Sequence, residues 1–478
     1  MPRAAACEQV LQRIAEQRIE RVRIAWCDLH GMLRAKTLMP QAVADALHDG
    51  LGMVSTMMLK DTSDRNVFNV FEPGVADELP GFGAANNLVL LPDPATFREL
   101  PWANGTGWMQ AQPWFDDATP VMLDTRRVLQ AALADLAREG LALRCGLEVE
   151  FHIYRIDDHR LDPQRAAWPG EALPVSMIHP GYNLLSEASA DLCDEPFAIV
   201  QRTAQGLGLP LRSLEIELGP SQVEAVFDAT DALTAADQMV LFRNGVRQAL
   251  RRHGYLATFV CRPPFADVMA SGWHLHHSLV DLTSGANRMR RDAPAHDARP
   301  HDAAATLSTL GEQHLAGLLA HARGMAALCT PTINGFGRFR PYALAPLSVV
   351  WGRDNRGALL RVLGRCGDAD TRIENRLGEP SANPYLYIAA QVHAGLDGIR
   401  RGLRAAPATD APYAGSAPPL PTSLAEALEA LAVDGALVQG FGAAFIDCFA
   451  RIKRAEITRH EQAADRDEWQ RREYFSRF

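Results

Sequence analysis

The chain has 478 residues, of which 47% are hydrophobic and 22% charged, and its formal net charge is −9. This composition predicts a globular protein of about two domains. Its acidic balance argues against a nucleic acid or an anionic membrane as partner, because both attract surplus Lys and Arg. No long apolar segment and no secretory signal are recognisable, so we expect a cytoplasmic protein that acts on small molecules.

Lysine is rare in this sequence. Of the 48 basic residues only Lys36, Lys60 and Lys453 are lysines, and none follows a glycine-rich phosphate loop. A P-loop NTPase is therefore excluded, and a pyridoxal-phosphate enzyme is disfavoured because few lysines could form its Schiff base. A bound nucleotide would depend on arginines and metal ions to hold its phosphates.

The first part of the chain predicts a small unit rich in β-strands. The segment Arg21–Met39 alternates apolar and polar residues on both sides of Asp28–Gly31, which is typical of a β-hairpin. A further strand is predicted over Asn87–Leu91. From Thr119 the pattern changes to helices and longer strands.

Capping residues and helical spacing of apolar residues predict four helices in the rest of the chain. They run from Asp124 or Thr125 to Arg138, over Asp231–His253, over Asn383–Leu403, and from Ser423 through Leu431, where Ser423 and Glu426 make a capping box. Composition predicts surface loops over Ala286–Ala305 and Ala405–Pro421.

Four stretches place ionisable side chains at alternate positions, which is the spacing of a β-strand. They are Glu148 and Glu150; Glu215 and Glu217; His274 and His276; and Arg372, Glu374 and Arg376. Buried unpaired carboxylates are too costly to keep ionised, so several charged strand faces can coexist only around a wet or metal-filled cavity. The pattern predicts a divalent-metal site.

Each stretch also has a simpler explanation. The glutamates could be the solvated face of a strand, the histidines a structural pair, and the last set surface ion pairs. The turn at Gly219-Pro-Ser221 predicts a hairpin that brings Glu217 and Glu224 together. The combination of all these stretches, with Arg356 and Arg361 upstream of the last, favours a functional site.

This ordered set resembles the glutamine synthetase family over nearly the whole chain. The similar segments are GLEVEF at 146–151, Glu217-Leu-Gly-Pro-Ser-Gln-Val-Glu224, ASGWHLHHSL at 270–279, Arg353-Asp-Asn-Arg356 and, most specifically, RIENRLGEPSANPY at 372–385. The resemblance implies an α+β fold. An N-terminal β-grasp domain would span residues 15–112, and a catalytic domain over 119–478 would contain an open, mainly antiparallel β-barrel flanked by helices.

The resemblance also implies roles for individual residues. Two divalent cations, Mg²⁺ or Mn²⁺, would be held by Glu150, Glu217 and Glu224 and by Glu148, His274 and Glu374. ATP, a substrate, would contact His276, Ser278, Arg356 and Arg372. Arg361, with Arg356, would act in catalysis by neutralising the transferring phosphoryl group, and Arg338 and Arg376 would bind the substrate carboxylates. Glutamate would be activated as an acyl phosphate and coupled to an amine. The implied assembly is a large homo-oligomer, a double ring with active sites at subunit interfaces.

Two departures from the family pattern concern the substrates. Leu344 stands where the family's mobile flap has a glutamate that serves ammonium, and an ammonium ion needs carboxylates to offset its desolvation. The family's Asn-Gly, which helps to hold glutamate, is Met269-Ala270 here. We therefore expect an alkyl or aryl amine as nucleophile and a γ-glutamyl amide as product. An authentic glutamine synthetase using ammonia, and a non-catalytic structural or sensing relative, are the alternatives.

Overall fold

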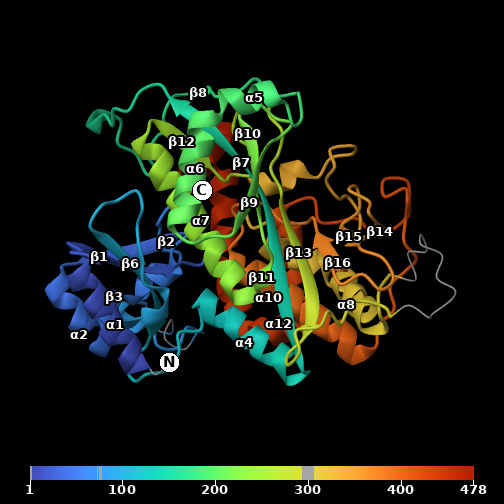
Figure 1. The fold of residues 1–478 in the computed structure, drawn as a ribbon, viewed down its shortest axis with the longest axis horizontal. Helices are drawn as coiled ribbons and strands as arrows, with labels where there is room; N and C mark the ends of the chain where they lie inside the picture. Colours follow the sequence, from blue (N-terminus) through green and yellow to red (C-terminus); the bar gives the residue numbers. More distant parts are fainter. Residues whose placement is uncertain (1–2, 73, 75–77, 293–305) are drawn as a thin grey trace.

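The structure is a computed structural model that describes residues 3–72, 74, 78–292 and 306–478. Two β-sheets organise the chain, a smaller one near the N-terminus and a larger one at the centre of the molecule (Figure 1). The predicted loop at 286–305 lies partly outside the described residues. Its described part, 286–292, contains neither helix nor strand.

The N-terminal sheet has six strands in the order β2-β1-β6-β4-β3, with β5 paired to β6. Its elements are α1 (Arg3–Glu16), β1 (Arg21–Cys27), β2 (Leu33–Leu38), α2 (Val43–Asp49), β3 (Leu51–Val54), β4 (Asn87–Pro92), β5 (Arg98–Glu99) and β6 (Thr106–Trp114). The predicted hairpin is confirmed as β1 and β2, and β1 also pairs in parallel with β6. The Asp28 side chain holds the hairpin turn by accepting from the backbone N–H groups of His30 and Met32, at 3.0 and 2.9 Å.

The central sheet has ten strands, with the main order β14-β15-β16-β13-β7-β10-β9. Its strands are β7 (Leu141–Ile156), β8 (Val175–Met177), β9 (Leu211–Ile216), β10 (Gln222–Phe227), β11 (Thr230–Asp231), β12 (Tyr255–Thr258), β13 (Trp273–Asp281), β14 (Trp351–Arg353), β15 (Leu360–Leu363) and β16 (Arg372–Asn375). Only β14 and β15 pair in parallel; the other pairs are antiparallel. The long strands β7 and β13 form the middle of this sheet (Figure 1).

Helices pack around the central sheet. They are α4 (Thr125–Arg138), α5 (Glu187–Leu192), α6 (Asp194–Gly206), α7 (Ala232–Arg252), α8 (Thr309–Ala320), α9 (Ala322–Cys329), α10 (Pro384–Arg401), α11 (Leu424–Ala432), α12 (Gly435–Phe441), α13 (Ala443–Glu461) and α14 (Arg466–Gln470). The four predicted helices are confirmed as α4, α7, α10 and α11, whose N-caps are Asp124, Asp231, Asn383 and Ser423. In the predicted capping box the carboxylate of Glu426 would accept from the N–H of Ser423. In the structure it accepts from the N–H of Thr422 instead, one residue earlier.

The core joins the apolar face of β7 to a bundle of helices around α10. Leu147, Val149 and Phe151 are buried, as the alternation of β7 predicts. The helices α8 and α10 come very close together, since a Cβ atom built on Gly317 would lie 2.2 Å from the carbonyl oxygen of Ala394. Glycine is therefore required at that contact. No single described helix is long and apolar enough to cross a membrane; α12 and α13 reach that length and composition only together, at a bend of 101°.

A histidine paired with two aspartates joins the junction of α8 and α9 to α10 and α12, and it supports a stability prediction. The His321 ring, between α8 and α9, lies 2.8 Å from Asp397 on α10 and 2.9 Å from Asp434, the N-cap of α12. Burial by itself would lower the pKa of His321, but the two carboxylates raise it above its ordinary value. The pair therefore stabilises the fold fully below about pH 6.5, the unfolded value, and its contribution is lost as pH rises through the raised folded value.

We expect His321→Gln to lower the free energy of unfolding by about 2 kcal/mol at pH 5.5 and by clearly less at pH 9. Urea denaturation at both pH values measures this. His48→Gln is the control, because the side chain of His48 is 86% exposed in its pair with Asp49, and no loss is expected at either pH. An equal loss for His321→Gln at both pH values would contradict the charged pair.

Candidate functional site

The register of the central sheet brings the predicted acids and histidines onto one face. Residues directly opposite one another in paired strands project to the same side. Glu148 on β7 is opposite His274 on β13, and Glu150 is opposite Glu224 on β10. On the other side of β13, His276 is opposite Glu374 on β16, which in turn is opposite Arg361 on β15. Strands distant in sequence thus build one charged wall.

This wall borders a cavity of about 1120 Å³. The lining includes every predicted site residue except Glu374: Glu148, Glu150, Glu217, Glu224, Ala270, His274, His276, Ser278, Arg338, Leu344, Arg356, Arg361, Arg372 and Arg376. The Glu374 side chain is fully buried behind the surface and contacts residues of the lining. A volume of this size exceeds the range of about 300–1,000 Å³ for typical ligand pockets, so several substrates can be held together.

The hairpin formed by β9 and β10 carries Glu217 and Glu224, as predicted. The backbone N–H of Glu217 donates to the carbonyl of Gln222 across the turn, at 3.0 Å. Ser221 in that turn has φ 60°, a left-handed conformation that few residues other than Gly or Asn adopt readily. The tight turn sets the two carboxylates on the same face of the sheet.

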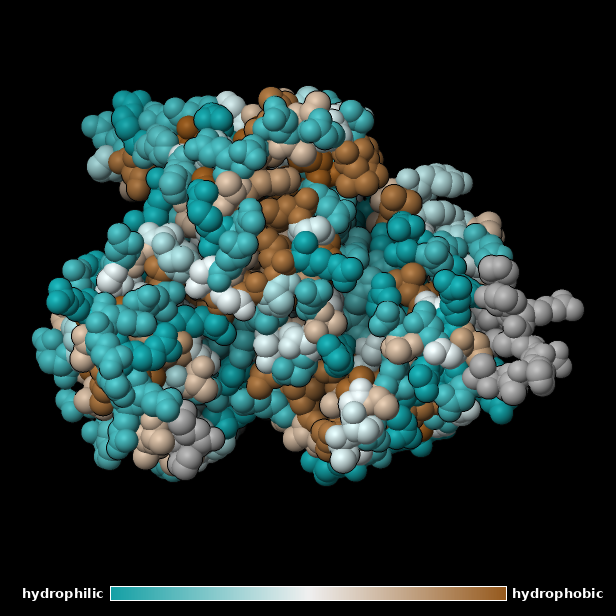
Figure 2. Space-filling model, in the orientation of Figure 1, coloured by the Kyte–Doolittle hydropathy of each residue, from teal (hydrophilic) through white to brown (hydrophobic). Residues whose placement is uncertain are grey.

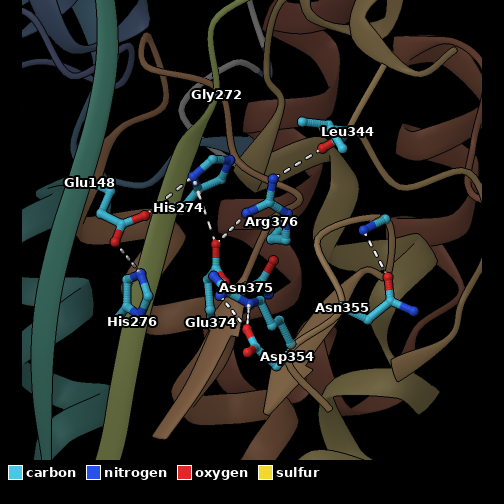
Figure 3. A network of polar contacts seen from close by, with 12 residues as sticks. Glu148, Gly272, His274, His276, Leu344, Asp354, Asn355, Glu374, Asn375 and Arg376 are labelled. Atoms are coloured by element: carbon cyan, nitrogen blue, oxygen red, sulfur yellow. Dashed lines mark hydrogen bonds and ion pairs between the residues drawn. The ribbon is translucent and has the colours of Figure 1, made fainter. Parts of the chain in front are cut away.

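His274 lies at the centre of the acids (Figure 3). Its Nδ1 is 3.5 Å from a carboxylate oxygen of Glu148 and 3.7 Å from one of Glu374, while its Nε2 is 3.7 Å from one of Glu150. Nε2 of His276 lies 3.0 Å from the other oxygen of Glu148. Burial lowers the pKa of His274 to about 4, so its imidazole is neutral at pH 7 and offers a nitrogen lone pair that a cation can bind.

The acids of β7, β9 and β10 have strongly shifted pKa values. Burial, and then repulsion from Glu217, raises the pKa of Glu150 to about 7. Burial, and then repulsion from Glu150, raises that of Glu224 to about 10. The pKa of Glu217 is raised as well, by burial first. Carboxyl groups that hold protons for this reason ionise readily when a cation joins them.

The donor set fits hard divalent cations. Single ligand atoms of Glu148, Glu224 and His274 all lie within 4.8 Å of one another, and so do those of Glu148, His276 and Glu374. Carboxylate oxygen with imidazole nitrogen suits Mg²⁺ or Mn²⁺. These two groups divide the residues differently from the two predicted sets, and both include Glu148.

Arginines cover the other side of Glu374. Arg361 donates from Nη1 to one carboxylate oxygen at 2.9 Å, and Arg376 donates to the other (Figure 3). Burial opposes ionisation of Glu374, but His274 and Arg376 outweigh it and lower its pKa to about 2. Arg338 is buried beside them and donates to the carbonyl of Arg376 at 2.9 Å. Positive charge therefore lies directly beside the acids in the lining of the cavity.

The remaining predicted residues also line the cavity. Arg372 donates from Nε to Nδ1 of His276 at 3.1 Å, and the hydroxyl of Ser278 donates to the carbonyl of Thr371 at 3.0 Å. Arg356 lines the cavity from the segment after β14 and is exposed. Two guanidiniums, a hydroxyl and an imidazole in the lining are groups suited to phosphates and a base.

Glu215, Leu184 and Leu185 are among the lining residues that were not predicted as site residues. Glu215, opposite Glu224, shares the face of Glu217, and its alternate spacing in the sequence was the available signal. Leu184 and Leu185 also line the cavity. They come from the irregular loop between β8 and α5, where no periodic pattern could identify them.

Comparison with known proteins agrees with this geometry. The family model described as "Glutamine synthetase, catalytic domain" matches residues 122–474. The chain is 37% identical to a γ-glutamylanilide synthase of Acinetobacter sp, covering 98% of this chain and 96% of the relative. It is 28% identical to the γ-glutamylethanolamide synthetase GlnA4 of Streptomyces coelicolor, with coverage of 98% and 96%. Among solved structures, ligand-free GmaS superposes with a TM-score of 0.77 at 29% identity, covering 97% of this chain and 98% of GmaS.

Proposed function

The chain belongs to the glutamine synthetase family, and we propose that it is an ATP-dependent ligase that joins the γ-carboxylate of glutamate to an amine. One observation carries the proposal: a single cavity combines the glutamates and histidines of four strands with arginines that lie beside them. Relatives that are similar over nearly their whole length are named for the synthesis of γ-glutamyl amides. A metal-dependent hydrolase would not need this set of arginines.

The reaction has two steps. A γ-carboxylate oxygen of glutamate attacks the terminal phosphorus of ATP, the bond to the bridging oxygen breaks, and ADP leaves. The amine nitrogen then attacks the carbonyl carbon of the acyl phosphate, inorganic phosphate leaves, and the nitrogen loses a proton to give the amide. Phosphoryl transfer of this kind depends on positioning and charge neutralisation more than on covalent help from the protein.

The acids are proposed to hold two divalent cations. Glu150, Glu217 and Glu224 would hold one, and Glu148, His274 and Glu374 the other. Glu148 belongs to both groups of closely spaced ligand atoms, so it could bind either cation. When bound, such cations neutralise phosphate charge and keep the phosphates in line with the attacking oxygen. The protein supplies closely spaced carboxyl groups whose pKa values are raised, first by burial and then by repulsion from one another.

The arginines are proposed to orient the anions. Arg372 and Arg356, with His276 and Ser278, would contact ATP, and Arg361 and Arg356 would neutralise the transferring phosphoryl group. Arg338 and Arg376 would bind the carboxylates of glutamate, beside Ala270. A guanidinium suits these roles because its planar fork binds carboxylate and phosphate oxygens in pairs.

We also propose the organisation that family membership suggests. Residues 15–112 would form a β-grasp domain, which the parallel pairing of β1 with β6 supports, and residues 119–478 the catalytic domain. The chain would assemble in the cytoplasm as a double-ring homo-oligomer with active sites between subunits.

A coupled assay of phosphate release over a panel of amines tests the proposed function. With ATP, glutamate and Mg²⁺, we expect phosphate release that depends on both glutamate and an amine, together with the matching γ-glutamyl amide by mass spectrometry. Replacing glutamate by aspartate should abolish it. Ammonia as the best acceptor would indicate an authentic glutamine synthetase instead. No phosphate release with any acceptor would contradict the ligase.

A further inference from the structure

Part of the cavity lining is apolar, which the chemistry of phosphoryl transfer does not require. Two loops contribute large exposed apolar side chains to it, 178–186 before α5 and 341–346 after the segment of Arg338. Leu184, Leu185 and Leu344 from these loops line the cavity and are 51%, 62% and 56% exposed. Figure 2 shows hydrophobic surface in the upper centre of the molecule, near the position of α5 and β10 in Figure 1.

Both loops are attached to the charged wall through their backbones. The N–H groups of Tyr182 and Leu185 donate to the carbonyls of Leu218 and Ile216, the residues on either side of Glu217. The carbonyl of Leu344 accepts from Nη2 of Arg376 at 3.1 Å (Figure 3). The leucine side chains are thus left free beside the groups that would bind and activate the acid.

The backbone conformation of each loop is unfavourable at these residues. The φ values of Leu185 and Leu344 are positive, at 55° and 52°. Tyr182 and Tyr342 in the same loops also have positive φ values, at 55° and 58°. A side chain with a Cβ atom rarely adopts this left-handed conformation, and strain of this kind persists where the surrounding structure imposes it, often at functional sites. A strained backbone that exposes a large apolar side chain has no benefit for stability.

The charge of the two loops supports the same conclusion. The segments His179–Ser186 and Pro341–Pro346 contain no Asp or Glu. The carboxylates of the lining lie on the strands of the wall or in the segments that flank them, where Asp228 follows β10 and Asp370 precedes β16. A cationic acceptor such as ammonium or a diamine would find no additional carboxylate on the loop side to offset its desolvation, whereas an apolar group would be removed from water there.

We infer that Leu184, Leu185 and Leu344 form the acceptor site and select primary amines with a bulky apolar substituent, an aromatic ring or a branched alkyl group. This inference rests on the proposed function and names its substrate class. The amine nitrogen is directed toward Arg376 and Glu217, where the acyl phosphate would form, and the substituent lies between the two loops. Selectivity follows from apolar contact, so it is expected in kcat/KM for the amine and not in KM for ATP or glutamate.

The test uses Leu185→Asn and Leu344→Asn, singly and together. Asparagine tolerates a positive φ better than leucine, so both variants should fold with a Tm equal to or above that of the wild type. For benzylamine and isobutylamine, we expect kcat/KM to fall at least tenfold in each single variant and about 100-fold in the double variant. The loss for ammonium, ethanolamine and putrescine should be much smaller, so that the ratio of kcat/KM for benzylamine to that for ammonium falls at least fivefold in each single variant. Leu192→Asn is the control, because Leu192 on α5 is 62% exposed but lies outside the lining.

Two results would overturn the inference. One is a wild type that prefers ammonium or putrescine to benzylamine. The other is a double variant with unchanged selectivity. A failure of the proposed function is recognised separately, because it shows no phosphate release with any acceptor. In that case saturation-transfer NMR of benzylamine still decides: binding to the wild type but not to the double variant supports the acceptor site, and equal binding to both, or none to either, refutes it.

Discussion

Replacing Glu224 with Gln is expected to lower the rate of amide formation by about 10³-fold without weakening the metal-free fold. The loss of rate follows because one ligand to a cation disappears, and a bound cation contributes several kcal/mol of charge stabilisation in phosphoryl transfer; about 4 kcal/mol corresponds to a factor of about 10³. The fold is not weakened because burial and Glu150 raise the pKa of Glu224 to about 10. At pH 7 without a cation this carboxyl group holds a proton, and Gln has nearly the same shape.

The same shift gives a pH dependence with a definite sign. Between pH 4.5 and 10 the unfolded chain has released the proton that folded Glu224 retains, so the metal-free wild type loses stability as pH rises through this window. Glu224→Gln removes that contribution. Urea denaturation in EDTA should therefore show the variant more stable than the wild type at pH 9 and about equal at pH 5, while added Mg²⁺ should restore stability to the wild type alone.

Glu215→Gln is the matched control, because Glu215 lies directly opposite Glu224 on β9 and is not assigned to a cation. We expect it to lower the rate less than tenfold. Retention of activity within threefold by Glu224→Gln, or a lower stability than the wild type at pH 9, would show that the acid does not act through a cation.

Replacing Glu374 with Gln should abolish turnover, as for a cation ligand, but unlike Glu224→Gln it should also destabilise the fold. The Glu374 side chain is fully buried and holds both Arg361 and Arg376. Removing its charge leaves two buried guanidiniums without their shared partner, which costs about 3–5 kcal/mol of unfolding free energy. Burial alone would raise the pKa of Glu374, but His274 and Arg376 lower it to about 2. The stability that the ionised Glu374 contributes is therefore present above pH 4.5 and is lost as pH falls toward 2.

Asp354→Asn is the control for this prediction. Asp354 also pairs with Arg361, but its side chain is 65% exposed, so we expect a loss of less than about 1 kcal/mol. Denaturation of the two variants with and without Mg²⁺ measures the difference. The structure indicates that Arg361 and Arg376 depend on Glu374 as their buried partner. Equal stability of Glu374→Gln and Asp354→Asn would contradict this.

Most of the charged wall could be predicted from the sequence because strands impose a period of two. Glu148 and Glu150 lie in β7, and His274 and His276 in β13, with their apolar neighbours buried on the other face. Alternate spacing says which side chains share a face within one strand. It does not say which strands pair, so the meeting of His274 with Glu148, Glu150 and Glu374 depended on the resemblance and then on the observed register.

The apolar portion of the cavity lining was only partly predictable. Leu344 was identified by its departure from a family motif, but Leu184 and Leu185 lie in an irregular loop whose conformation is set by hydrogen bonds to β9 and its turn. The predicted bounds of α4, α7, α10 and α11 agree with the structure within about two residues. The other helices, among them α1, α6, α8 and the 19-residue α13, were not predicted, since their positions are set by tertiary packing more than by local pattern.

Anomalous diffraction from crystals soaked in Mn²⁺ and an ATP analogue tests the central claim most directly. The account predicts two Mn²⁺ peaks in the cavity, both within coordination distance of carboxylates and at least one contacting His274 or Glu148, with phosphate oxygens completing the ligands. Glu224→Gln crystals should lose one of the two peaks. Absence of any peak among Glu148, Glu150, Glu224, His274 and Glu374, with the analogue bound elsewhere, would contradict the account.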